Sequence, residues 1–357
     1  MAGKRNNSIE LLRDLLMLGI CVLHSCALGG YRTGWVCRLL CPCVPCFIFI
    51  SGYYGIKATP LRIAKLIGTA FACVPAIGIV SWFAGCHGID GFAIGAKGVA
   101  DNWFVWAYVG LMCFAPALNH ALESEKRLSL TLPIIVMCLG WGYLKGLPWF
   151  RTFMPTTDGL GGFTFTMMIG TYLVAGLWRR FLYRVEACRG GEGIGRVERV
   201  ETCRDRKWMK LCELDWIMRG LEKTAVCWVL LVAATGLCIA GFSAYCSPVS
   251  VFWSAILFTI FSRFEISGRI GKVASFVAKS TFPIFILHAN GVGFGLIRKF
   301  AALCCGNYGI NVYMMYLIVG FTVFVVGLLL DMPRRAIGWM VARKRLAEES
   351  VCKKLVI

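Results

Sequence analysis

The feature that most constrains this chain is a series of long apolar runs separated by charged residues, glycine and proline. The runs fall near residues 9–29, 35–56, 62–85, 102–119, 129–145, 163–182, 224–243, 248–262, 275–297 and 311–331. About 20 apolar residues suffice for an α-helix to cross the hydrocarbon core of a bilayer. The sequence therefore predicts an all-α, polytopic integral membrane protein of about ten transmembrane helices.

Composition and charge agree with a membrane location. The 357 residues are 58% hydrophobic and 16% charged, outside the range of soluble proteins. A formal net charge of +19 is compatible with nucleic-acid binding only if the basic residues gather on one soluble face. Here most of them lie between alternate spans, which is the positive-inside pattern. We therefore expect both termini in the cytoplasm, contact with membrane lipids, and no nucleic-acid partner.

The length leaves no room for a separate soluble domain. We expect one transmembrane domain over residues 1–345, with a cytoplasmic loop at 183–223 and a cytoplasmic tail at 346–357. Arg13 and Asp14 interrupt the first run and no small-residue cleavage site follows it, so this run is interpreted as a retained span. The mixture of basic and apolar residues after residue 333 is typical of an interfacial helix on anionic lipid.

The 19 Cys lie mostly inside predicted spans and lack the spacing of a disulfide framework. Cys41, Cys43 and Cys46 cluster in the second run, but no fitting His or Cys pair accompanies them, and no metal is expected. The two prolines among these cysteines predict a kink in the second span.

The first run carries the most informative pair of polar residues. Arg13 and His24 are eleven positions apart, so an α-helix places them on one face, about 16 Å apart along its axis. Ionisable groups inside a bilayer are costly and tend to face a protein interior or a cavity. Arg13 could instead snorkel to the interface and pair with Glu10 or Asp14.

The same run resembles the opening of a known family. IELLRDLLMLGICVLH is similar to the first span of the acyltransferase-3 family of membrane O-acyltransferases, in which Arg, ten residues and His follow an acidic residue. Glu10 here stands three residues before Arg13. The family's later motifs follow in order, as FIFISGYYG (Ser51, Gly52), LRIAK (Arg62, Lys65), WFVWAYVGLMCFAP (residues 103–116), FPIFILHANG (His288) and DMPRR.

Three positions depart from the family pattern. Lys65 stands where Arg is usual, Phe285 where Tyr is common, and Ala289 where Pro often follows the His. Lys does not replace Arg in bidentate phosphate contact, so the assignment of Lys65 is weaker than that of Arg62.

The resemblance implies an O-acyltransferase, in particular an O-acetyltransferase of the bacterial cytoplasmic (inner) membrane. Its donor would be acetyl-CoA and its acceptor a hydroxyl of a cell-surface or lipid-linked glycan. Such a transfer needs a group that removes the hydroxyl proton, for which a neutral His is suited. His24 is the candidate catalytic residue, as base or as acyl carrier, together with Arg13. The expected donor-binding residues are Arg13, Arg62, Lys65, Ser51 and Gly52, and the expected substrate-binding residues are His288, Trp103 and Tyr108.

Several of these residues have a plainer interpretation. A Ser-Gly pair such as Ser51-Gly52 also permits close helix packing. His288 could simply bond the carbonyl of a neighbouring helix, and Trp103 and Tyr108 could belong to an interfacial aromatic belt. The alternative function is a transporter or exporter of a small or glycan-linked substrate, because intramembrane Arg and His also suit a permeation path. The oligomeric state is not predicted.

Overall fold

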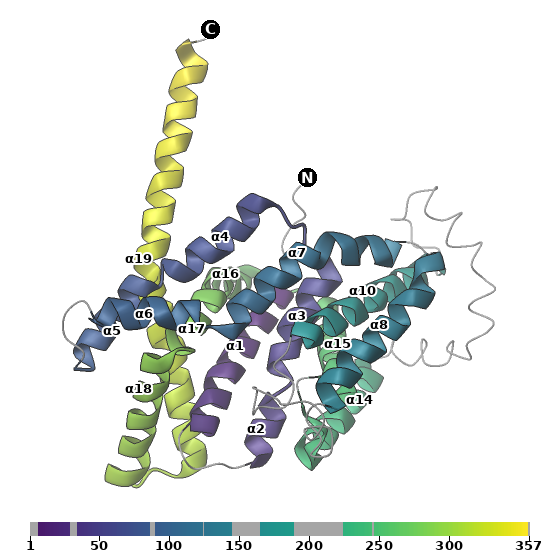
Figure 1. Cartoon of the computed structure of the whole chain (residues 1–357), viewed down its shortest axis with the longest axis horizontal. Coiled ribbons are helices and arrows are strands. Elements are labelled where there is room, and N and C mark those ends of the chain that lie inside the picture. Colours follow the sequence, from purple (N-terminus) through teal and green to yellow (C-terminus); the bar gives the residue numbers. More distant parts are fainter. Residues whose placement is uncertain are drawn as a thin grey trace. The chain divides into compact units, whose positions relative to one another are not determined.

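The computed structural model describes residues 6–28, 34–85, 90–123, 125–144, 165–188, 224–244 and 246–355. All regular structure within these ranges is helical (Figure 1). The α-helices are α1 (Asn7–Leu28), α2 (Gly34–Leu40), α3 (Cys43–Tyr54), α4 (Pro60–Phe71), α5 (Val74–Phe83), α6 (Asp90–Ala100), α7 (Trp103–Glu123), α8 (Glu125–Leu144), α10 (Phe165–Cys188), α14 (Thr224–Leu237), α15 (Pro248–Arg263), α16 (Gly268–Val277), α17 (Thr281–His288), α18 (Gly291–Ala302) and α19 (Val312–Leu355). Short helical turns are η1 (Cys238–Phe242), η2 (Ala278–Ser280) and η3 (Leu303–Asn307).

Seven helical stretches in the described ranges are long and apolar enough to cross a membrane. They are Asn7–Leu28, Gly34–Tyr54, Pro60–Phe83, Trp103–Glu123, Thr224–Phe242, Gly268–His288 and Val312–Lys344. Shorter apolar helices at Leu130–Gly140 and Pro248–Arg263 coincide with the fifth and eighth predicted runs. The prediction of an all-α, polytopic membrane protein is confirmed, whereas the count of about ten spans stays a prediction.

Some element boundaries differ from those expected. The run predicted at 275–297 is wrong as a single span, because α17 ends at His288 and α18 begins at Gly291. Asn290 between them has extended backbone angles, φ −145° and ψ 171°. The second span is interrupted at Cys41 and Pro42, between α2 and α3, as its prolines predicted. The expected loop 183–223 begins inside α10, and its residues 189–223 lie outside the described ranges.

The last span and the tail form one helix. α19 continues from Val312 to Leu355 and is the long yellow helix of Figure 1. Pro333 lies inside this helix without ending it. The expected tail is therefore helical through Leu355 and continuous with the last span.

The chain folds into two compact units that share α1, α4, α7 and α16. The first unit comprises residues 1–16, 33–60 and 106–272, and the second comprises residues 17–32, 61–105 and 273–357. Inside a bilayer the solvent is as apolar as the side chains, so close packing and internal hydrogen bonds hold helices together. Small residues at helix contacts are therefore expected in both units.

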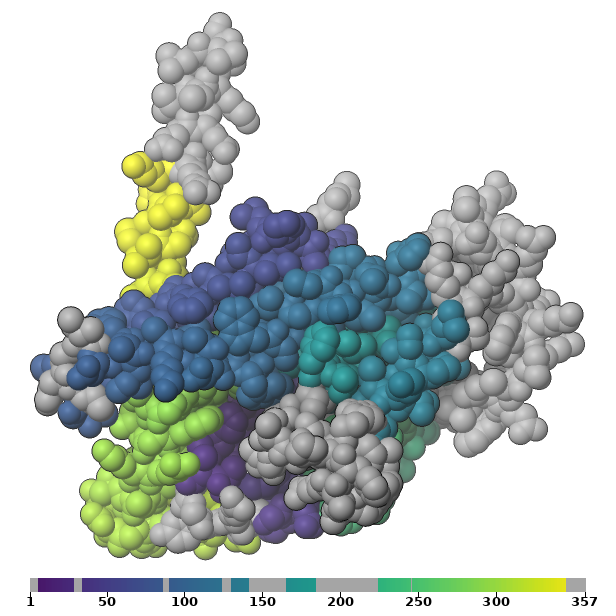
Figure 2. Space-filling view, viewed as in Figure 1, coloured from purple at the N-terminus to yellow at the C-terminus, as the bar shows by residue number. Residues whose placement is uncertain are grey.

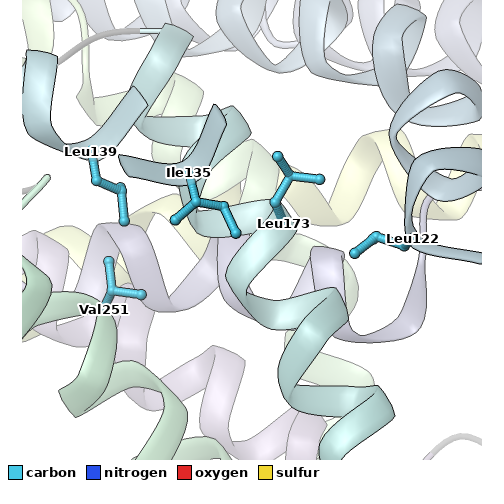
Figure 3. Packing of buried hydrophobic residues seen from close by; sticks show 5 residues of the cluster. All are labelled: Leu122, Ile135, Leu139, Leu173 and Val251. Atoms are coloured by element: carbon cyan, nitrogen blue, oxygen red, sulfur yellow. The ribbon is translucent and has the colours of Figure 1, made fainter. Parts of the chain in front are cut away.

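The first unit is built around α3 and α10. A Cβ added to Gly52 of α3 would lie 2.5 Å from the carbonyl oxygen of Tyr172 in α10, so only glycine fits this contact. Nearby, α7, α8, α10 and α15 share a buried apolar cluster (Figure 3), composed of Leu122, Ile135, Leu139, Leu173 and Val251. Gly52 thus has the packing role that sequence analysis considered beside a role in donor binding.

In the second unit α19 packs against α1 and α17. A Cβ on Gly320 would lie 2.5 Å from Cγ2 of Val22, and one on Gly327 would lie 3.2 Å from Cγ2 of Ile284. The two glycines are seven residues apart on α19, so they face the same side of that helix. This contact brings the second half of α1 and the helix that ends at His288 into one packed layer.

An ion pair on α19 is hydrogen-bonded to the residue just before α17. Asp331 is 2% exposed and accepts hydrogen bonds from Ser280 Oγ at 2.7 Å and from Arg334 Nη2 at 2.9 Å. Arg335 donates to Ser280 Oγ at 3.2 Å and to the carbonyl of Phe276 at 3.0 Å. The acidic-x-Pro-x-Arg motif therefore fixes the base of the helix that carries His288.

Replacing Asp331 by Asn should destabilise the protein. The substitution leaves the Arg334 guanidinium half-buried without its anion, a change that typically costs about 3–5 kcal/mol. Reversible unfolding in mixed detergent micelles would measure the free energy of unfolding. Glu265→Gln, at an exposed position in the loop before α16, is the matched control and should change the free energy of unfolding far less. Equal effects of the two substitutions would contradict the structural role of Asp331.

Candidate active site

Two histidines from distant parts of the sequence meet in the second unit. His24 Nδ1 of α1 lies 2.9 Å from His288 Nε2 of α17. The ring centroids are 5.0 Å apart with an interplanar angle of 56°. His288 Nδ1 lies 2.6 Å from the carbonyl oxygen of Ile284, one turn earlier in α17. The three groups form a continuous hydrogen-bonded chain.

The carbonyl at the end of this chain sets the tautomer of both rings. A carbonyl oxygen can only accept, so the hydrogen in its bond with His288 belongs to Nδ1. In a neutral ring His288 Nε2 then carries a lone pair and accepts from His24 Nδ1. His24 Nε2 is consequently left with a lone pair. That atom can take a proton or attack a carbonyl carbon.

The surroundings of the two rings differ. His288 is 5% exposed, whereas His24 is only partly buried. Phe294 of α18 contacts the His24 ring edge-on, with centroids 5.3 Å apart, and Phe285 contacts His288 in the same way at 5.9 Å. His24 is therefore the more exposed of the two rings, and His288 lies behind it.

Arg13 lies in the first unit, on the earlier half of α1. Its Nη1 is 3.2 Å from Oε1 of Glu10, and the two side chains are 31% and 6% exposed. Arg13 is thus held by a buried carboxylate, the pairing considered for it in the sequence. Glu10 Oε2 and Asp14 Oδ1 are buried and have no hydrogen-bond partner among the described residues. Two acidic groups therefore flank one guanidinium.

One hydroxyl of the same unit, that of Tyr108, lies within electrostatic range of Arg13 and bonds a second hydroxyl. Ser51 Oγ is 3.1 Å from Tyr108 OH, and the Tyr108 phenol lies within electrostatic range of Arg13. Ser51 also donates to the carbonyl of Phe47 at 3.1 Å. Two of the expected site residues, Ser51 and Tyr108, are thus brought together beside a third, Arg13.

The turn after α3 is fixed by a second polar group. Tyr172 OH donates to Asn119 Oδ1 at 2.7 Å and accepts from Ile56 N at 2.8 Å. Asn119 Nδ2 in turn donates to the carbonyl of Ile56 at 3.1 Å. These bonds hold the chain where it passes from Ser51-Gly52 towards the basic residues of α4.

The remaining expected residues lie at the surface of the second unit. Arg62 and Lys65 are exposed on α4, the violet-blue helix on the face shown in Figure 2. Trp103, at the start of α7, is 37% exposed and contacts Phe104 edge-on. No group of three His, Cys, Asp or Glu side chains in the described ranges could hold a metal ion.

Comparison with known proteins assigns the chain to a family. The family model for acyltransferase-3 proteins, described as an acyltransferase domain, matches residues 6–333. The chain belongs to the acyltransferase-3 family. No curated protein and no solved structure has a significant match to it. Family membership makes this chain a multi-pass membrane acyltransferase.

Within this acyltransferase-3 chain, two asparagines escaped the sequence analysis. Asn102 precedes α7 and Asn290 precedes α18, and both are about nineteen-twentieths buried. Each caps its helix, since Asn102 Oδ1 accepts from Phe104 N and Asn290 Oδ1 accepts from Val292 N. An Asn directly before an apolar helical run is a recognisable capping signal. That signal was available in the sequence, but the contacts of the two amide groups were not.

Nitrogen NMR can test the tautomer chain directly. The chain has four His, so selective ¹⁵N labelling of histidine gives few signals. His87→Gln and His120→Gln would remove the other two. We expect His24 and His288, in lipid nanodiscs at neutral pH, both to carry hydrogen on Nδ1 and none on Nε2. A protonated Nε2 on either ring would contradict the hydrogen-bonded chain.

Proposed function

We propose that the chain is an O-acetyltransferase that moves the acetyl group of acetyl-CoA to a hydroxyl of a glycan. The observation that carries this proposal is the hydrogen-bonded pair of His24 and His288. A neutral imidazole with a free Nε2 and a fixed Nδ1–H is the arrangement that general base catalysis needs. A half-buried ring backed by a fully buried one is also protected from bulk water.

The chemical step then follows from the tautomer. His24 Nε2 takes the hydroxyl proton while the hydroxyl oxygen attacks the thioester carbonyl carbon. The carbon–sulfur bond breaks, and the leaving thiolate takes the proton from His24, so that the products are an ester and free CoA. Alternatively, Nε2 attacks the thioester carbonyl first, the carbon–sulfur bond breaks and CoA leaves as the thiolate. The acceptor hydroxyl then attacks the acetyl group on His24, the carbon–nitrogen bond breaks, and the hydroxyl proton passes to the thiolate. Both routes use the same lone pair and return His24 to its starting form.

We assign three basic side chains to the acyl donor, one of which, Arg13, is also paired with Glu10. CoA carries several phosphates, which guanidinium groups bind well through paired N–H donors. Arg13, within electrostatic range of the Tyr108 phenol, supplies donors in the first unit. We also assign Arg62 and Lys65 to donor binding, as the family resemblance implies. Since α1 is one continuous helix, its rise separates Arg13 from His24 by about 16 Å, which an extended pantetheine arm can bridge.

The acceptor and location in this proposal follow the family resemblance. We assign the acceptor to a cell-surface or lipid-linked glycan and the protein to the cytoplasmic (inner) membrane with both termini in the cytoplasm. Trp103, exposed at the start of α7, is a residue on which a sugar ring could stack. An exporter would need no base with a fixed tautomer, and the family match supports acyl chemistry rather than transport.

Acetyl transfer by the purified protein tests this function. In nanodiscs with radiolabelled acetyl-CoA and glycan acceptors, His24→Ala should lower kcat by about a hundredfold or more, because the base is lost. Arg13→Lys keeps the charge but loses bidentate contact, so the KM for acetyl-CoA should rise about tenfold. His120→Ala is the control, because this ring is exposed and pairs only loosely with Glu123.

Three results would count against the proposal. A fully active His24→Ala variant would remove His24 from the chemistry. Absence of any labelled product would remove acetyl-CoA as donor, and passage of a glycan-linked substrate without covalent labelling would favour the exporter.

A further inference from the structure

The backbone between α17 and α18 has to satisfy several carbonyl groups. An α-helix leaves its last carbonyls without partners in the helix, and in a membrane protein there is little water to replace them. The carbonyl of Phe285 accepts from Ala289 N at 2.8 Å. The carbonyls of Ile286 and Leu287 both accept from Asn290 Nδ2, each at 3.0 Å. One amide group thus closes the end of the helix that carries His288.

Asn290 also begins the next helix. Its Oδ1 accepts from Val292 N and Gly293 N, each at 3.0 Å. All the hydrogen-bonding capacity of the amide nitrogen, and both lone pairs of the oxygen, are therefore used within this one junction. The side chain closes α17 and starts α18, so it fixes the backbone on both sides of Ala289.

Asn102 bonds another carbonyl of this junction, that of Ala289, from a different part of the chain. Its Nδ2 donates to the carbonyl of Ala289 at 3.0 Å, while its Oδ1 accepts from Phe104 N at 3.2 Å and Val105 N at 3.3 Å. The donor half of the amide therefore contacts the residue next to His288, and the acceptor half caps α7. The two functions of the side chain use different atoms.

Steric contacts hold the same two junctions together. A Cβ on Gly98, near the end of α6, would lie 2.9 Å from Cβ of Asn290. A Cβ on Gly293 would lie 2.3 Å from the carbonyl oxygen of His288, which is backbone and cannot move aside easily. The junction of α6 and α7 and the junction of α17 and α18 are thus docked without spare space, and His288 lies at the contact.

We infer that Asn102 is a positioning residue for acyl transfer: its amide N–H fixes the Ala289 carbonyl and, through it, the orientation of His288 towards His24. This inference rests on the proposed function. Asn102 acts through His288 and does not touch the reacting atoms. Loss of the Asn102 N–H group should therefore turn the His288 ring away from His24 Nδ1. The binding of acetyl-CoA should be unchanged.

Substitution can separate the two functions of Asn102, hydrogen bonding to the Ala289 carbonyl and capping of α7. Asn102→Ser keeps a short oxygen that caps α7 but cannot reach Ala289, whereas Asn102→Ala removes both functions. We expect both variants to lower kcat by about tenfold to a hundredfold, as misplacement of catalytic groups does. The KM for acetyl-CoA should stay within about twofold, because the lost hydrogen bond joins two parts of the protein and does not involve acetyl-CoA. Only Asn102→Ala should also lose the stability that the cap provides.

Asn311 provides the matched control. Its Oδ1 accepts from Tyr313 N at 2.9 Å at the start of α19, so it is a helix cap on an exposed side chain. Asn311→Ala should lower the melting temperature and leave kcat unchanged. Gly98→Ala is a second test, because its added methyl group would displace Asn290 without removing any hydrogen-bonding group.

The ¹⁵N signals of His288 supply a readout that does not require turnover. In Asn102→Ser, we expect the His24 Nδ1–H to lose its bond to His288 Nε2 and both nitrogens to shift. The inference is overturned if Asn102→Ser keeps wild-type kcat and histidine signals, or if Asn311→Ala lowers kcat as much as Asn102→Ala does. If no acetyl transfer occurs in the wild type but the shifts appear in Asn102→Ser, the acetyltransferase proposal fails while the positioning of His288 by Asn102 stands.

Discussion

The structure of the second unit depends on one constraint: the backbone carbonyls exposed by the break after His288 need hydrogen-bond donors from within the protein. A membrane-embedded chain cannot leave such groups to water. Asn290 supplies donors for Ile286 and Leu287, and Asn102 supplies the donor for Ala289. Both side chains are almost fully buried, so these hydrogen bonds are shielded from competing solvent. They constrain the backbone on both sides of His288, the last residue of α17.

That rigidity has a chemical consequence. The Ile284 carbonyl accepts from His288 and so fixes the hydrogen of that ring on Nδ1. His288 Nε2 in turn accepts from His24 and fixes the hydrogen of that ring on its Nδ1. In a Ser-His-Asp triad an Asp carboxylate fixes the tautomer of the catalytic His. Here a neutral carbonyl and a second imidazole would do so, without placing a negative charge in the membrane interior. Avoiding that charge matters, because an isolated ion in apolar surroundings is very unfavourable.

The sequence predicted the parts of this arrangement that depend on local pattern. Apolar runs identified the helical membrane fold, the prolines predicted the break in the second span, and the order of motifs identified the family. His24 and His288 were both singled out, but their contact was not, because 264 residues separate them and no periodicity within one helix reports on another. The run at 275–297 is two helices, because Asn290 closes one and caps the next. The Asn is visible in the sequence as a capping signal, but the sequence does not show that its amide also bonds the last carbonyls of the preceding helix.

The two halves of α1 show how one helix can serve two chemical needs. Its first turns place Arg13 beside buried Glu10, so the guanidinium is fixed while part of it stays accessible. Its later turns place His24 against His288, with Nε2 directed away from the hydrogen-bonded chain. A flexible linker between a phosphate-binding group and a base would let their separation vary with each turnover. A continuous helix fixes that separation by its rise, so an Arg and a His eleven positions apart within one span would suit the proposed transfer from a long, extended donor.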